Sequence, residues 1–87
     1  MEIRWHHWAS KEIDNLKKDL ANRILDKIEE TAKDPQHFLE GLTGTKFHKI
    51  RVGIYRVIIK WDRKNDILSI IMIDTRDRIY KRLHRLL

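Results

Sequence analysis

Four positive side chains and a tyrosine in the second half of the chain are the clearest candidates for chemistry. Lys49, Arg51 and Arg56 lie close together in sequence, and Tyr80 follows Arg76 by one helical turn. Arginine matches the geometry of phosphate oxygens, and clustered cations stabilise charge that develops on a phosphorane. Neighbouring cations also lower the pKa of a lysine or tyrosine. The group therefore predicts a groove that binds a phosphodiester.

The pattern of residues 47–58 indicates a β-hairpin that turns near Gly53. If the loop is Gly53–Ile54, glycine takes the position that a type II′ turn requires, and Arg51 lies opposite Arg56. If the loop is Val52–Gly53, Lys49 lies opposite Arg56 instead. Both registers place two cations face to face, which costs a few tenths to about 1 kcal/mol.

No acidic residue on these two strands offsets the repulsion, so a bridging anion is the expected ligand. A three-residue loop ending at Gly53 would place His48 opposite Arg56 and weaken this argument. For any single arginine, the alternative interpretation is a solvated surface charge or an ion pair, for example with Asp74 or Asp77.

The distribution of charge also favours a polyanionic partner. Residues 1–42 contain seven Lys/Arg and nine Asp/Glu, whereas residues 43–87 contain twelve and four. A basic half on so small a domain points to nucleic acid or an acidic protein, the alternative being a lysine-rich solvated surface. The chain lacks cysteine, a signal-peptide pattern and any apolar run long enough to span a bilayer. We therefore expect one cytoplasmic domain over residues 1–87, with no membrane contact.

Hydrophobic periodicity predicts an α+β domain in the order β-α-α-β-β-β-α. A short first strand covers residues 2–7, and two helices follow between residues 9 and 33, capped by Ser10 and separated near residues 17–19. Asp34–Pro35 ends the second helix and begins a turn over residues 36–40. Three strands follow at 47–52, 54–61 and 67–74, then a basic amphipathic helix over 75–87. We expect the helices on one side of the sheet, although the last two strands are apolar on both faces, which is typical of strands covered on each side.

Other kinds of site find little support. The five histidines have neither cysteine partners nor H-E-x-x-H spacing, so a zinc site is not expected. The three glycines are scattered, so no phosphate-binding loop is present. The three tryptophans are interpreted as core or helix-packing residues rather than as surfaces on which bases stack. No metal or other cofactor is expected.

These residues resemble a known family, the RelE/ParE toxin superfamily. Residues 38–44 (FLEGLTG) and 49–58 (KIRVGIYRVI) are similar to its hairpin, which reads much like R-x-R-x-G-x-Y-R-V-I, and residues 9–16 (ASKEIDNL) resemble its first helix. The resemblance implies a microbial ribonuclease-like RelE fold, with a helical hairpin on a four-stranded antiparallel sheet. It also implies the toxin of a type II toxin–antitoxin pair, bound to an acidic RelB-like antitoxin in a hetero-oligomer.

The resemblance implies two possible activities. RelE-like members cleave mRNA in the ribosomal A site and so inhibit translation, whereas ParE-like members inhibit DNA gyrase and generally lack the basic catalytic set. Arg56, Arg76 and Tyr80 fall on the ribonuclease residues of RelE-like toxins, and Lys49 and Arg51 match the basic hairpin strand. The candidate catalytic residues of a metal-independent endoribonuclease are thus Lys49, Arg56, Arg76 and Tyr80; the candidate RNA-binding residues are Lys46, Arg51 and Arg78. The chain departs from the pattern at Thr75, where relatives often carry histidine or lysine.

RNA cleavage by transesterification needs a base for the 2′-hydroxyl, charge stabilisation on the phosphorane and a proton for the departing 5′-oxygen. We expect Arg56 and Arg76 to stabilise the phosphorane, because arginine does not exchange protons readily. The base and the acid are left open among Lys49, Tyr80 and His48. Besides the ribosome-dependent nuclease, a gyrase inhibitor and an RNA-binding domain that does not cut are the alternatives.

Overall fold

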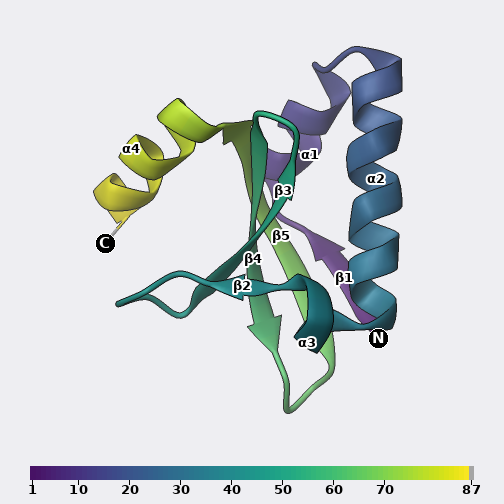
Figure 1. The fold of residues 1–87 in the computed structure, drawn as a ribbon, viewed down its shortest axis with the longest axis vertical. Helices are drawn as coiled ribbons and strands as arrows, with labels where there is room; N and C mark the ends of the chain where they lie inside the picture. The colour runs from purple at the N-terminus through teal and green to yellow at the C-terminus, as the bar shows by residue number, and fades with distance from the viewer. Residues whose placement is uncertain (87) are drawn as a thin grey trace.

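A five-stranded sheet forms the centre of the molecule, with helices on both of its faces (Figure 1). The computed structural model describes residues 1–86. In chain order the elements are β1 (Glu2–Trp5), α1 (His7–Asp14), α2 (Lys18–Lys33), α3 (Pro35–Phe38), β2 (Glu40–Gly41), β3 (Phe47–Val52), β4 (Tyr55–Asp62), β5 (Ile67–Thr75) and α4 (Arg76–Leu86). The strands lie in the order β1-β5-β4-β3-β2.

The predicted α+β order is confirmed, with two differences in the sheet. The two-residue strand β2 pairs with β3, and β1 runs parallel to β5, so the sheet is five-stranded and mixed rather than four-stranded and antiparallel. The strands β3, β4 and β5 form the expected antiparallel meander. Because two helices separate β1 from that meander, no hairpin forces β1 to run antiparallel to its neighbour.

The two N-terminal helices divide where the sequence predicts, between Asp14 and Lys18. The cap of α1 differs from the prediction: Ser10 lies inside the helix, and His6 is the N-cap, with its Nδ1 accepting a hydrogen bond from the Trp8 N–H at 3.2 Å. Proline occupies the first turn of α3, as expected. Within residues 1–86 no helix combines the length and the apolar composition needed to cross a bilayer.

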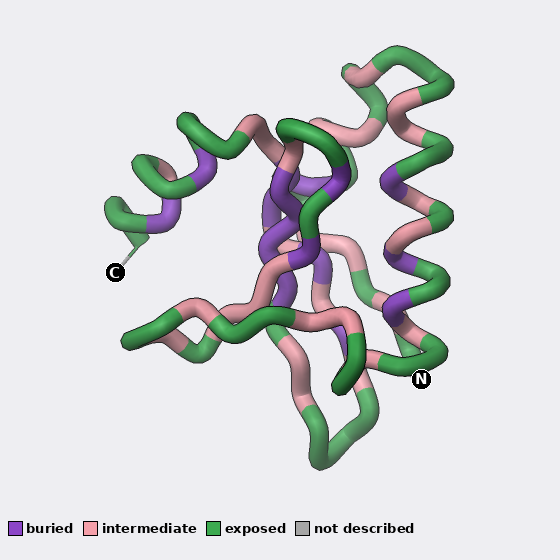
Figure 2. Tube along the Cα trace, in the orientation of Figure 1, coloured by how far each residue is buried: buried purple, intermediate pink, exposed green. Residues whose placement is uncertain are grey.

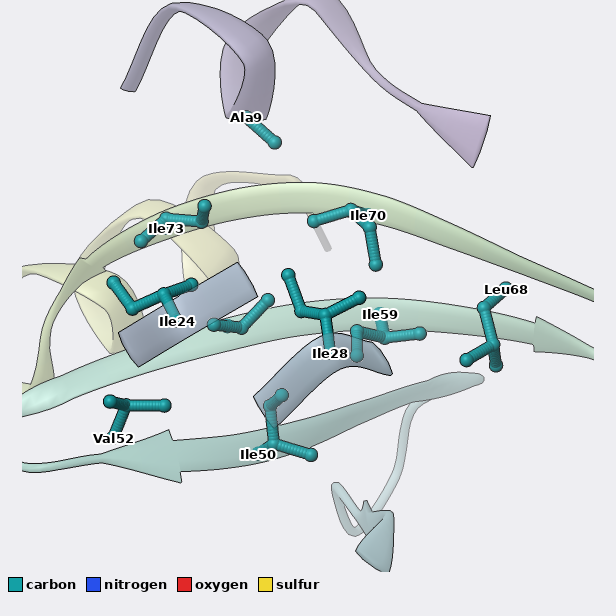
Figure 3. Close-up of a cluster of buried hydrophobic side chains, with 10 residues drawn as sticks. Ala9, Ile24, Ile28, Ile50, Val52, Ile59, Leu68, Ile70 and Ile73 are labelled. Atoms are coloured by element: carbon teal, nitrogen blue, oxygen red, sulfur yellow. The ribbon is translucent and has the colours of Figure 1, made fainter. Parts of the chain in front are cut away.

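The larger hydrophobic cluster lies between the sheet and the helical hairpin. Figure 3 shows Ile24 and Ile28 of α2 pointing toward Ile50 of β3, Ile59 of β4 and Ile70 of β5. All five side chains are buried, and Ala9 of α1 closes the cluster above β5. Helical spacing on α2 and alternation on the strands place these residues on facing surfaces.

A smaller cluster lies on the opposite face, under α4. Ile79 and Leu83, one turn apart on α4, pack against Ile58 of β4 and Met72 of β5. Figure 2 shows buried residues on the inner sides of both α2 and α4, while their outer sides are exposed. The expectation of helices on one side of the sheet is therefore wrong for α4. The apolar residues on both faces of β4 and β5 correctly indicated that both faces are covered.

The β3–β4 hairpin has the Gly53–Ile54 loop. Arg51 pairs with Arg56 and Val52 pairs with Tyr55, and Gly53 adopts a positive φ of 59°. Only glycine takes this conformation without strain. The prediction that places Arg51 opposite Arg56 is therefore confirmed, and the other two registers are excluded.

We predict that Ile24→Ala lowers the free energy of unfolding by about 2–5 kcal/mol, because it leaves a cavity in the larger cluster. Urea denaturation followed by circular dichroism measures the change. Ile54→Ala is the matched control, since Ile54 is 68% exposed at the hairpin turn and its truncation is expected to change stability by less than about 0.5 kcal/mol. Equal losses in the two variants would contradict the assigned core.

Candidate functional site

The hairpin register places Lys49, Arg51 and Arg56 on one face of the sheet. Lys49 and Arg51 alternate with His48 on β3, and they lie on the face that α4 covers. His48 lies on the other face, where its ring contacts Trp61 edge-on at 5.7 Å between centroids. Burial, followed by the charge of Arg63, lowers the pKa of His48. The structure therefore removes His48 from the candidate site.

Lys49 and Tyr80 meet between β3 and α4. The Lys49 Nζ donates a hydrogen bond to the Tyr80 hydroxyl at 2.8 Å, and the Lys49 side chain is only 17% exposed. This hydrogen bond is the main reason why the pKa of Tyr80 lies below its usual value, and the charges of Lys49 and Arg56 lower it further. The predicted effect of clustered cations on Tyr80 is thus present in the structure.

Glu40, which the sequence analysis did not assign, completes this group. Its carboxylate accepts a hydrogen bond from Arg51 at 2.9 Å and lies 4.0 Å from the Lys49 Nζ. The hydrogen bond from Arg51 lowers the pKa of Glu40, with smaller contributions from Lys49 and Arg56. The hairpin strands themselves place no carboxylate beside Arg51 and Arg56, as the sequence predicts. The additional strand β2, which the sequence did not predict, brings Glu40 opposite Lys49 and within reach of Arg51.

Arg56 is almost fully buried, at 7% exposure. Its Nη1 donates to the backbone carbonyls of Gly53 and Tyr55, each at 2.9 Å, so this side chain also holds the hairpin turn. Its Nε–H has no hydrogen-bond acceptor in residues 1–86. Its cross-strand neighbour Asp74 forms an ion pair with Arg82 instead.

Arg76 begins α4 beside the hairpin turn. Its backbone N–H donates to the Ile54 carbonyl at 2.8 Å, which attaches the helix to the turn. The Arg76 side chain is 67% exposed, and its Nε lies 3.9 Å from the Asp77 carboxylate. Arg56 and Arg76 line the same cavity of about 330 Å³ between the turn and the start of α4. The structure thus brings two predicted phosphorane-binding arginines to one concavity.

Two of the predicted RNA-binding residues lie outside this group. Arg78 faces another cavity, which it shares with Asp74 and the basic residues of the outer side of α4. Two residues along a helix rotate a side chain by about 200°, away from the side that carries Arg76 and Tyr80. Lys46 lies in the loop between β2 and β3 and lines a separate hollow beside Phe47. In the described part of the chain, no cluster of three His, Cys, Asp or Glu side chains is arranged to hold a metal ion.

An ion-pair network on the other side of α4 fixes the position of Tyr80. Arg82 bridges Glu12 of α1 and Asp74 of β5, the latter at 3.1 Å, and all three side chains are more than two-thirds buried. Glu12 also accepts a hydrogen bond from the Ile73 N–H at 2.9 Å, on the edge of β5 that β1 leaves unpaired. Polar contacts therefore hold α4 on both sides of its buried residues Ile79 and Leu83. Tyr80 contacts β3 on one side, and Arg82 contacts β5 on the other.

We predict that Lys49→Met raises the pKa of Tyr80 toward its usual value, because the variant removes both the hydrogen bond and the nearby charge. The ultraviolet absorbance of phenolate, taken as the difference from the Tyr80→Phe protein, isolates this tyrosine from Tyr55. Lys46→Met serves as the matched control and leaves the pKa unchanged. An unaltered pKa in Lys49→Met would contradict the contact.

We also predict that Arg82→Met lowers the free energy needed to detach α4 from the sheet by about 1–2 kcal/mol. This value lies between those typical of exposed and of buried ion pairs. The amide hydrogens of α4 then exchange faster, and the pKa of Tyr80 rises because Lys49 no longer has a fixed partner. Arg85→Met, on the exposed side of the same helix, is the control. Identical exchange rates in both variants would mean that the network does not hold the helix.

Comparison with known proteins agrees with the fold and the hairpin. The family described as the ParE toxin of type II toxin–antitoxin systems matches residues 3–80. Among curated proteins none matches the chain. A RelBE toxin–antitoxin complex from Mycobacterium tuberculosis is similar in structure, with a TM-score of 0.78 and 17% identity over 86% of this chain and 96% of that chain.

Two further solved structures show the same arrangement. The RelE–RelB complex of Pyrococcus horikoshii has a TM-score of 0.74 and 25% identity, over 88% of this chain and 96% of that chain. The isolated RelE toxin of E. coli has a TM-score of 0.71 and 19% identity, over 99% and 98% of the two chains. These structures confirm the RelE-type fold, and the family match covers nearly the whole sequence. The chain therefore belongs to the ParE toxin family of type II toxin–antitoxin systems, within the RelE/ParE superfamily.

Proposed function

We propose that this toxin is a ribosome-dependent endoribonuclease that cleaves mRNA in the A site and so inhibits translation in the cytoplasm. The observation that carries the proposal is the Lys49–Tyr80 hydrogen bond beside Arg56, which in turn lines one cavity with Arg76. A proton-transfer pair beside two phosphate-binding arginines supplies the parts that transesterification requires.

In this proposal the arginines stabilise charge. Arg76 is exposed and free to contact the scissile phosphate, while Arg56 is fixed by the backbone of the turn. Because Arg56 is already ordered, little reorganisation accompanies the development of charge on the phosphorane. Arg51 holds the RNA backbone once a phosphate replaces the Glu40 carboxylate with which it pairs in the structure.

Lys49 and Tyr80 carry the proton transfers. The lowered pKa of Tyr80 brings it closer to neutral pH, where general acid–base catalysis is most effective. The lowered pKa of Glu40 favours its carboxylate form, which lies 4.0 Å from the Lys49 Nζ and helps to orient that side chain toward Tyr80. The reaction uses the 2′-hydroxyl of the RNA as its nucleophile and proceeds without a metal ion.

The partner in this proposal is an acidic RelB-like antitoxin in a hetero-oligomeric complex. The chain has a formal charge of +6, and RelE toxins of similar fold are known in complexes with RelB antitoxins. An acidic partner with an amphipathic helix would neutralise the basic half and cover the site.

A gyrase inhibitor is the second candidate, because the matching family model is that of the ParE toxins. The two candidates differ in what they require of the site. A gyrase inhibitor acts by protein binding and has no need of a lysine–tyrosine pair beside two arginines, so the nuclease accounts for more of the structure.

We predict that Arg76→Ala lowers mRNA cleavage about 10²–10³-fold, as loss of one transition-state donor does, and that Tyr80→Phe lowers it about 10²–10⁴-fold. Purified protein is added to a cell-free translation reaction, and the 3′ ends of the mRNA are mapped. Arg63→Ala, an exposed arginine in the β4–β5 turn, is the control and retains full cleavage.

The same preparation separates the other functions. Wild-type protein that leaves mRNA intact but inhibits DNA supercoiling by gyrase would establish the second candidate. Protein that binds RNA with steep salt dependence and cuts nothing would leave only an RNA-binding domain.

A further inference from the structure

A large hollow in the described structure has no role in the site above. It has a volume of about 900 Å³ and is open to solvent. Its lining residues come from the start of α1, the β2–β3 loop, the end of α4 and the strands β3, β4 and β5. Figure 1 shows the β2–β3 loop and the C-terminal end of α4 on the same side of the sheet. The described lining residues are His6, Trp8, Gly44, Thr45, Lys46, Phe47, Lys60, Ile71 and Leu86.

The charged residues that line this hollow are both positive. Lys46 and Lys60 are both exposed, and neither forms an ion pair within residues 1–86. The nearby Asp62, whose pKa the charge of Lys60 helps to lower, does not line the hollow. None of the described lining residues is acidic. The site around Lys49 and Arg51, in contrast, contains Glu40. The hollow is therefore suited to an anionic ligand.

Aromatic rings supply the other part of the surface. Trp8 is 37% exposed, and its ring lies 4.4 Å from that of His6, centroid to centroid. Phe47 also lines the hollow and is partly exposed. The sequence analysis interpreted the tryptophans as packing residues, yet Trp8 is the most exposed aromatic side chain of this hollow. Exposed rings beside lysines are the usual surface for single-stranded nucleic acid, because bases stack and phosphates pair with the cations.

The hollow continues the candidate site along one strand. Phe47 and Lys49 are next-but-one neighbours on the same face of β3, about 7 Å apart. Lys60 is the cross-strand partner of Phe47. Strand β3 therefore connects Lys49 of the candidate site with Phe47, which lines the hollow.

We propose that this hollow is a subsite for a nucleotide of single-stranded RNA adjoining the scissile phosphate, with Trp8 stacking on the base and Lys46 and Lys60 contacting the backbone. This inference rests on the proposed nuclease function. An acidic, apolar protein segment would also find complementary charge here, but only RNA accounts for the continuity with the phosphodiester site.

The test measures binding without cleavage. A short, fluorescently labelled 2′-O-methyl RNA lacks the nucleophilic hydroxyl, so its affinity is measured by fluorescence anisotropy on the intact protein. We expect Trp8→Ala to weaken binding about ten-fold, as loss of one stacked base does, and Trp8→Phe to retain most of the affinity. We expect Lys46→Ala/Lys60→Ala to reduce the slope of log affinity against log salt by about 1.4, or about 0.7 for each lost phosphate contact.

Lys33→Ala/Lys64→Ala is the control, because it removes two exposed lysines away from the hollow and matches the loss of charge. Equal affinities and slopes in the control and the Lys46/Lys60 variant would overturn the proposal. It would also be overturned if the hollow variants bound RNA normally but lost affinity for an acidic amphipathic peptide. Failure of the nuclease function is seen separately, as intact mRNA in the translation reaction with wild-type protein.

Discussion

The site depends on one constraint, the two-residue turn at Gly53–Ile54. A slip of one residue in the β3–β4 pairing would exchange the faces of β3, burying Lys49 and Arg51 against α2 and exposing Ile50. Gly53 accepts the positive φ that this turn needs, and the Arg56 side chain binds the turn's carbonyls. The Ile54 carbonyl then accepts the first N–H of α4, so the same turn also sets where the helix that carries Tyr80 begins.

The cations of this face differ in how they are neutralised. Arg51 pairs with Glu40, and Arg82 is shared by two carboxylates, so both serve to hold elements together in the free protein. Arg56 donates its hydrogen bonds to backbone carbonyls, which are neutral acceptors and leave the positive charge of the guanidinium in place. Of these cations, Arg56 is therefore the one whose charge no carboxylate within residues 1–86 pairs with, and it lies at the hairpin turn.

Much of this arrangement follows from local sequence, and the exceptions have physical causes. Periodicity located the helices and the β3–β4–β5 meander, because each pattern extends over several turns or residue pairs. The pairing of Arg51 with Arg56 was one of three registers that the sequence left open, and the structure selects it. Glu40 escaped notice because a two-residue strand has no periodicity. The side of the sheet occupied by α4 is set by long-range packing of Ile79 and Leu83. The exposure of Trp8 could not be predicted, because its residue type does not distinguish a packed ring from an exposed one.

The brevity of β2 has a consequence for the behaviour of the free toxin. Because β2 pairs with only two residues of β3, much of that strand's outer edge is left without a full-length neighbour. An uncovered strand edge invites polymerisation with other chains unless charges discourage it. Arg51 lies beyond the two residues of β3 that β2 covers, and its side chain is 57% exposed. A charged side chain beside the uncovered edge discourages pairing with another copy, so a residue proposed to bind RNA also acts against self-association.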